Sequence, residues 1–274
     1  MEGARLYDKE QKLSEGGVAL KEKKNKKSGD IMYRIIMTIL IIIIAVCCIK
    51  LGKIFYEYYV GKKVYDSIAD RAGAAGDELI IDWDELEKEN DDIVAWLYSK
   101  GTVINYPVVQ GDDNQFYLTH MFNKQWNGKG TLFVDTNCED PFNGFNTIVY
   151  GHRMKDGSMF RSIVEYRDKK GYFDEHRKMI LLTKDQRYNL EIFAASRIPQ
   201  NSELYNMTFY SDDEKAAYLA NVASINQIPD YDGSVNVGPS DRIVMMSTCT
   251  REVDDNRIVV WGKLVEQKSK KTKN

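Results

Sequence analysis

Cysteine and histidine are scarce in this sequence, with 4 and 3 copies among 274 residues. The histidines and the two cysteines that lie beyond the N-terminal hydrophobic run, Cys138 and Cys249, show none of the spacings that bind zinc. Acidic residues are abundant, but no run of them has the pattern of a calcium-binding loop. The sequence therefore predicts no metal and no other cofactor.

Positive charge is also in short supply over most of the chain. Residues 52–267 contain 24 Lys and Arg against 35 Asp and Glu, a balance of −11. An acidic body argues against nucleic acid as a partner. Residues 268–274 form a short basic tail, which we expect to be a solvated, disordered end.

Only one long hydrophobic run is present, from Ile31 to Ile49, and it is interrupted only by Arg34 and Thr38. Nineteen helical residues span roughly 28 Å, close to the ~30 Å hydrocarbon core of a bilayer. The run predicts a single transmembrane helix over residues 31–51. No second run would anchor the C-terminal part.

Lysines flank this hydrophobic run unequally. Five of them lie between Lys21 and Lys27, whereas Lys50 and Lys53 follow the run closely. The positive-inside rule then places residues 1–30 in the cytoplasm and the rest of the chain outside the cell membrane. A cleaved signal peptide is the alternative, but no small-x-small cleavage site follows the run.

Beyond the hydrophobic run the pattern is mainly β with added helices. We expect a helical linker over 52–81, with a break at 73–76, and then one catalytic domain over 82–267 that opens with a helix ending at Glu89. A longer helix starts at the capping box of Ser211 and runs to about Ile225. Strand-like runs rich in β-branched residues favour a closed β-barrel. They cover 103–109, 131–135, 146–150, 178–182, 188–196, 241–246 and 257–266.

Chemistry is concentrated at the end of the run before Cys249. A polar turn over 251–256 separates that run from the one that begins at Arg257, and an antiparallel pair would bring the two residues side by side. A thiolate nucleophile needs a nearby positive group, and acyl transfer needs a donor for the developing oxyanion. Cys249 and Arg257 supply both.

A proton carrier is the missing group, and His152 supplies it at the end of the apolar run Thr147-Ile148-Val149-Tyr150-Gly151. His120 lies in a polar stretch and His176 on a charged, solvated face, so both are weaker candidates. Only His152 ends a strand before a loop, where a functional group is exposed on a rigid support. The three residues together predict a thiol acyl-transfer site.

Each of these residues has rival interpretations. Cys138 could form a disulfide with Cys249, which would consume the nucleophile, so we interpret Cys138 as a bystander thiol. Arg153 and Arg251 are weaker candidates than Arg257. Two neighbours of the cysteine, Ser247 and Thr248, are candidate substrate-binding residues, although Ser247 has an equally good interpretation as a plain strand-end hydroxyl. No acidic residue is an obvious third member of the site, and Glu252 is a doubtful one.

Several segments, in a fixed order, resemble the sortases, in particular class B. They are Ile93-Val94-Ala95-Trp96-Leu97, Tyr106-Pro107-Val108-Val109-Gln110-Gly111, Asp113-Asn114, Tyr117-Leu118, Gly151-His152-Arg153-Met154-Lys155-Asp156-Gly157-Ser158-Met159-Phe160, Ser247-Thr248-Cys249-Thr250 and Arg257. Met245 and Met246 stand where sortases usually carry Thr-Leu. Asp140-Pro141-Phe142 is similar to the lid of class C sortases but lies between barrel strands, so a turn is the better interpretation.

The resemblance implies a membrane-anchored cysteine transpeptidase of Gram-positive bacteria. Cys249 would cleave a Pro-x-Thr type sorting signal after Thr through a thioacyl intermediate, with His152 as acid and base and Arg257 holding the oxyanion. Its partners would be secreted proteins that carry a C-terminal sorting signal and an amine of a peptidoglycan precursor. Two other functions remain open: a membrane-tethered cysteine peptidase and a non-catalytic anchored binding module.

Overall fold

A computed structural model describes the backbone of residues 2–74, 79–249 and 255–267, and the side chains of 30–74, 79–248 and 255–267. The chain divides into two compact units, with the boundary between Tyr56 and Glu57. The second unit therefore begins inside the segment that the sequence assigned to a linker. Most of the predicted turn over 251–256, with Arg251 and Glu252, lies outside the described residues, as does the basic tail.

Helix α1 runs from Glu2 to Arg71. From Asp30 onward it is long and apolar enough to cross a membrane, judged by length and composition. It ends at the predicted break, where Gly73 takes φ +70° and a Cβ would lie 2.4 Å from the carbonyl oxygen of Ile80. Only glycine adopts that conformation readily, so the glycine fixes the end of the helix.

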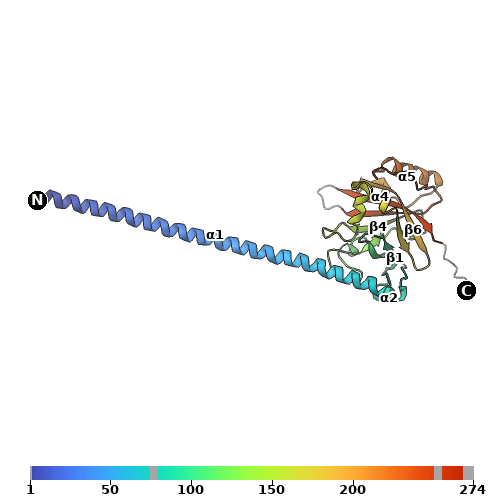
Figure 1. Ribbon diagram of the computed structural model, residues 1–274, viewed down its shortest axis with the longest axis horizontal. Helices are drawn as coiled ribbons and strands as arrows, with labels where there is room; N and C mark the ends of the chain where they lie inside the picture. The colour runs from blue at the N-terminus through green and yellow to red at the C-terminus, as the bar shows by residue number, and fades with distance from the viewer. Residues whose placement is uncertain (1, 75–78, 250–254, 268–274) are drawn as a thin grey trace. The chain divides into compact units, whose positions relative to one another are not determined.

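Eight strands of the described chain form a closed barrel in the order β1-β2-β3-β4-β7-β8-β6-β5 (Figure 1). The strands are β1 (Ile93–Tyr98), β2 (Asn105–Val109), β3 (Leu132–Val134), β4 (Asn146–His152), β5 (Lys178–Leu182), β6 (Arg187–Pro199), β7 (Ile243–Cys249) and β8 (Asn256–Glu266). The helices that accompany them are α2 (Trp83–Glu89), α3 (Glu165–Asp168), α4 (Tyr172–Glu175) and α5 (Asp212–Ser224). Single 3-10 turns cover Phe116–Leu118, Ser162–Val164 and Glu203–Tyr205. The predicted closed barrel is confirmed.

The predicted helix start at Ser211 is also confirmed, and α2 likewise begins with a side-chain cap. Asp82 accepts a hydrogen bond from the backbone N–H of Glu85, and Ser211 accepts one from that of Glu214. Each satisfies an N–H that the first helical turn leaves without a partner. Asp140-Pro141-Phe142 lies in a turn between β3 and β4, as predicted.

Two strand predictions need correction. Residues 93–98 are not among the expected strands, but they form β1, which pairs with β2 and β5 and thereby closes the barrel. The strand expected from Val103 begins at Asn105, because a turn held by the Thr102 hydroxyl, which donates to the Ser99 carbonyl, occupies the preceding residues.

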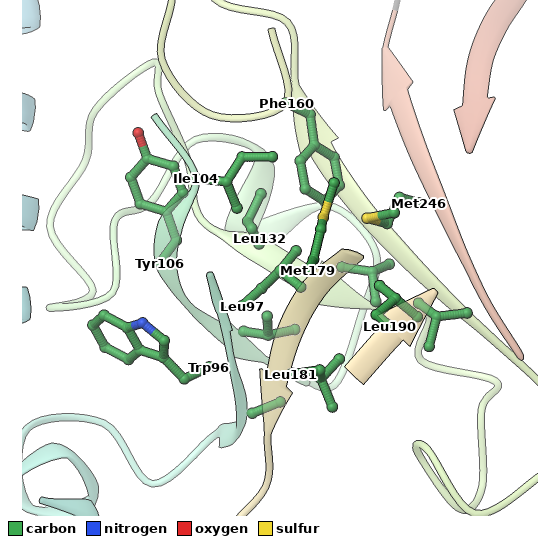
Figure 2. Close-up of a cluster of buried hydrophobic side chains, with 14 of the residues drawn as sticks. Trp96, Leu97, Ile104, Tyr106, Leu132, Phe160, Met179, Leu181, Leu190 and Met246 are labelled. Atoms are coloured by element: carbon green, nitrogen blue, oxygen red, sulfur yellow. The ribbon is translucent and has the colours of Figure 1, made fainter. Parts of the chain in front are cut away.

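The hydrophobic core has two parts. Inside the barrel, Leu97, Leu132, Leu181, Leu190 and Met246 from β1, β3, β5, β6 and β7 form one cluster with Phe160 (Figure 2). The second cluster lies on the outer face of β4, β6, β7 and β8 and includes Tyr218 and Val222 of α5. Strands β4, β7 and β8 are therefore buried on both faces along most of their length, and only their ends are available for chemistry.

Candidate active site

Three neighbouring strands place the candidate catalytic residues side by side. Strand β4 pairs in parallel with β7, and His152 is the register partner of Cys249. Strand β8 pairs with β7 on its other side, and Arg257 is again the partner of Cys249. The Cys249 backbone therefore lies between the two positions that the sequence analysis selected with it.

Alternation along the strands assigns these positions to one face of the sheet. On β7, Val244 and Met246 belong to the interior cluster, whereas Ile243 and Met245 belong to the outer cluster under α5. Because successive residues point to opposite faces, positions 247 and 249 lie on the outer face. The same alternation, counted from Ile148 on β4 and from Val259 on β8, puts His152 and Arg257 on that face.

The imidazole of His152 is oriented by a backbone group. Its Nε2 lies 2.7 Å from the carbonyl oxygen of Leu118. A carbonyl only accepts hydrogen bonds, so Nε2 carries the hydrogen in this arrangement. Nδ1 is then the nitrogen that gains or loses a proton when the ring changes charge.

The guanidinium of Arg257 is also held in place. Its Nη2 donates to Oε1 of Gln200 at 2.8 Å, and its Nη1 donates to the carbonyl of Asn256 at 3.2 Å. A guanidinium has five N–H donors in a fixed plane, so these two bonds leave donors available for a further acceptor. The geometry suits a group that binds a carbonyl oxygen.

A cavity of about 210 Å³ adjoins these residues. It is lined by Asn114, Leu118, Phe133, Tyr150, Gln200, Tyr205 and Arg257. Arg257 thus faces the cavity directly, and His152 reaches its wall through Leu118. Aromatic walls and a few polar groups are typical of a site for a short peptide segment.

The two predicted substrate-binding residues differ in their surroundings. Ser247 is 1% exposed, and its hydroxyl lies 2.8 Å from that of Tyr205, a cavity-lining residue. Thr248 is fully buried and, by alternation, lies on the interior face of β7. Ser247 is therefore connected to the cavity through the side chain of Tyr205.

Among the polar residues of the cavity, four were given no role from the sequence: Asn114, Gln200, Tyr150 and Tyr205. Asn114 lies in Asp113-Asn114, one of the segments that resemble the sortases, and that resemblance was the only feature of the sequence that pointed to it. Gln200 and Tyr205 follow β6 in a connecting segment without periodicity, so nothing in the sequence points to them. The Tyr150 and Tyr205 rings stack with centroids 6.3 Å apart, which brings β4 and this segment together.

The rival histidines are engaged elsewhere. His120 stacks on the Phe116 ring at 4.0 Å between centroids, and its Nδ1 lies 2.8 Å from the Phe116 carbonyl. The charged face predicted around His176 is exposed at Asp174 and Glu175, whose side chains are 66% and 68% exposed, but the imidazole of His176 is largely covered. Its side chain is only 11% exposed because it packs against Tyr172. Neither ring lines the cavity beside Arg257.

Cys138 carries a free thiol, so the alternative disulfide with Cys249 is absent. The residue is buried, and burial raises the pKa of its thiol above the ordinary value of 9.0. A thiol is nucleophilic only as the thiolate. Cys138 is therefore unsuited to be the nucleophile at neutral pH.

Comparison with known proteins agrees with this geometry. The sortase domain family matches residues 99–265. The chain belongs to the sortase family. It is 34% identical to sortase B of Listeria monocytogenes over 206 residues, which cover 74% of this chain and 82% of that protein. These matches define a class B enzyme, a cysteine transpeptidase.

Solved sortase structures share the fold. A Staphylococcus aureus sortase B–substrate complex has a TM-score of 0.69 and 28% identity, and the match covers 78% of this chain and all of that one. A sortase B complexed with Gly3 has a TM-score of 0.62 and 32% identity, over 68% of this chain and 86% of that one. The similarity thus extends over the whole barrel.

Proposed function

We propose that this transpeptidase uses Cys249 as its nucleophile and cleaves a Pro-x-Thr type sorting signal after the threonine. The observation that carries the proposal is the register of β4, β7 and β8, which sets Cys249 between His152 and Arg257. A thiol, an imidazole and a guanidinium can supply the nucleophile, the proton carrier and the oxyanion donor that acyl transfer from a peptide to a thiol requires.

In the first half-reaction the Cys249 thiolate attacks the carbonyl carbon of the threonine. Arg257, held by Gln200, donates hydrogen bonds to the oxyanion that forms. The C–N bond then breaks, and the leaving amine takes a proton from Nδ1 of the His152 imidazolium. The product is a thioester between the threonine carbonyl and Cys249, with His152 neutral.

In the second half-reaction an amine of a cell-wall precursor attacks the thioester. It gives a proton to Nδ1 of His152, and the Cys249 thiolate leaves, so the imidazolium and thiolate are restored. The triglycine in one related structure is an amine of the required kind. The substrate complex of another supports a peptide signal as the acyl donor.

We further propose that α1 anchors the enzyme with its N-terminus in the cytoplasm and the catalytic unit outside. The lysines before residue 31 outnumber those that follow the span, which supports this orientation. A cell-surface location would place Cys249 where both secreted proteins and peptidoglycan precursors are available.

The test uses the full chain in detergent with a panel of fluorogenic peptides that contain Pro-x-Thr. Intact-mass spectrometry is expected to detect an acyl adduct on the wild-type enzyme and none on Cys249→Ala. Added triglycine is expected to convert the adduct into a peptide extended by three glycines. Release of only the free acid, at a rate independent of triglycine, would identify a peptidase and contradict transpeptidation.

A further inference from the structure

Lys129 has the least exposed ammonium group among the ion pairs of the described residues. Its side chain is 3% exposed, and its Nζ lies 2.5 Å from Oδ2 of Asp156 and 2.9 Å from Oγ of Ser158. A buried charge is costly unless it is paired and hydrogen-bonded, and one missing partner leaves an uncompensated charge. Such a pair is often less stabilising than apolar residues of similar volume. The place of this pair in the fold therefore indicates a role other than stability.

Asp156 and Ser158 belong to the loop that follows His152 directly. The backbone N–H of Phe160 donates to the carbonyl of His152 at 2.9 Å, which closes the loop at its base. Within the loop, Oδ1 of Asp156 accepts from the hydroxyl of Ser158 at 2.6 Å. Burial raises the pKa of Asp156, but hydrogen bonds from Lys129 and Ser158 outweigh that effect and keep it below its usual value. The carboxylate is therefore charged when it holds the loop.

The segment that carries Lys129 also supports the other contact of His152. At Gly130 a Cβ would lie 2.3 Å from the carbonyl oxygen of Tyr117 and 2.9 Å from that of Leu118. The next residue, Thr131, donates its N–H to the Tyr117 carbonyl at 2.9 Å. The Leu118 carbonyl is the one that orients the imidazole. The segment from Lys129 to Thr131 thus contacts both the loop after His152 and the backbone that carries the Leu118 carbonyl.

The part of α1 that belongs to the second unit, residues 57–71, contacts this segment. The hydroxyl of Tyr65 donates to the carbonyl of Gly130 at 2.5 Å, and the ring of Tyr58 lies 5.6 Å from the Lys129 ammonium. At Gly61 a Cβ would lie 2.6 Å from Cδ of Lys129, so the lysine stem crosses the helix where it has no side chain. The stem is therefore confined on the helix side as well.

We propose that the Lys129–Asp156 ion pair is a positioning device that sets the orientation of His152, a proposal that rests on the catalytic role proposed for His152. The pair ties the loop after His152 to the segment that supports the Leu118 carbonyl. A displacement of about 1 Å in a catalytic group can cost roughly 10²-fold in rate. The pair touches no cavity residue through its own hydrogen bonds, so it acts on turnover rather than on peptide binding.

The test compares Lys129→Met, Asp156→Asn and the double variant with the wild type, all as full chains in detergent. Lys178→Met is the control, because it breaks the ion pair with Glu191 on β5 and β6, which does not involve the loop after His152. Readouts are kcat and KM for transpeptidation, thermal unfolding, and NMR spectra of ¹³C-labelled histidine. Three histidines in the chain make the signal of His152 assignable by its substitution.

We expect each single variant to lower kcat by about 10- to 100-fold with little change in KM, and to shift the His152 signal. The double variant removes both charges, so its thermal stability should rise above that of the weaker single variant while kcat stays low. If the pair served only the stability of the fold, the double variant would instead recover both thermal stability and kcat. That result, or folded single variants whose kcat and His152 signal match those of Lys178→Met, would overturn the proposal.

If Lys129→Met does not fold, Ser158→Ala serves in its place, because it removes the two hydrogen bonds of the Ser158 hydroxyl to Lys129 and Asp156 but leaves both charges of the ion pair. If the wild-type enzyme formed no acyl adduct, the proposed function itself would instead be overturned. The two failures are distinguishable, because the NMR comparison does not depend on turnover.

Discussion

Gln200 accepts a hydrogen bond of 2.8 Å from Nη2 of Arg257 and thereby ties the guanidinium to the segment that follows β6. The bond fixes the plane of the guanidinium, and oxyanion binding depends on the direction in which its N–H groups point. Arg257 is held from outside its own strand, so its orientation depends on a residue with no catalytic chemistry of its own.

Gln200→Ala is therefore expected to reduce kcat by about 10-fold, less than the loss of one oxyanion donor, which costs roughly 10²–10³. The charge of Arg257 remains, but its plane is free to rotate. Steady-state transpeptidation kinetics measure the effect. The neighbouring exposed residue supplies the control, since Asn201→Ala removes a polar side chain without contact to Arg257. Equal rates for the two variants would contradict the orienting role.

Arg257→Lys tests the fork of donors itself. The substitution keeps the positive charge but replaces a planar group with a point charge on a flexible stem. We expect kcat to fall by roughly 10²–10³ while the enzyme stays folded. Single-turnover formation of the acyl adduct is the direct measurement. Near-normal acylation by the lysine variant would reduce the role of Arg257 to its charge.

Cys138 and Cys249 are expected to differ in reactivity toward iodoacetamide. Burial raises the pKa of the Cys138 thiol above its ordinary value of 9.0, so the folded protein holds it neutral to higher pH than the unfolded chain does. This contribution to stability is fully present below the unfolded pKa and is lost as the pH rises through the folded one. Peptide mapping after alkylation at pH 8 is expected to find Cys249 labelled and Cys138 protected.

Urea-unfolded protein is the control for that experiment, because both thiols are then exposed and are expected to label at similar rates. Faster labelling of Cys138 than of Cys249 in the folded enzyme would exclude the assignment of the nucleophile. Cys138→Ser is expected to leave transpeptidation unchanged.

The hydroxyl of Tyr218 connects α5 to the barrel. It accepts hydrogen bonds from Nε1 of Trp261 at 3.0 Å and from Nδ2 of Asn146 at 3.2 Å, and it donates to the Leu204 carbonyl at 3.0 Å. Tyr218→Phe takes this partner from the buried Trp261 N–H and from the Leu204 carbonyl, whereas Nδ2 of Asn146 keeps its bond to the Asn206 carbonyl at 2.8 Å. Each unsatisfied group costs about 1–3 kcal/mol, so we expect the free energy of unfolding to fall by at least that amount.

Urea unfolding measures this loss, and Tyr210→Phe is the matched control because Tyr210 is 88% exposed. The control is expected to unfold at the wild-type urea concentration. A Tyr218→Phe variant as stable as the control would show that water replaces the lost hydrogen bonds.

Local patterns in the sequence were sufficient wherever a short stretch decides its own structure. The strand over 178–182 was predicted with the bounds of β5, and the capping box at Ser211 marked the start of α5. Side-chain caps and β-branched runs act over a few residues, so they can be read without the fold. The predicted membrane span over residues 31–51 also rests on a local pattern, its length and hydropathy, and stays a prediction.

The sequence by itself determined the residue types of the site: a cysteine, a histidine and an arginine at the ends of apolar runs. Only the tertiary structure decided their neighbours. The parallel pairing of β4 with β7 joins residues nearly a hundred positions apart along the chain. Gln200 and Tyr205 line the cavity from a segment without periodicity. Lys129 lies before β3 and forms an ion pair with Asp156 in the loop after β4. No local propensity encodes such contacts, because they form only when the barrel closes and burial selects one register.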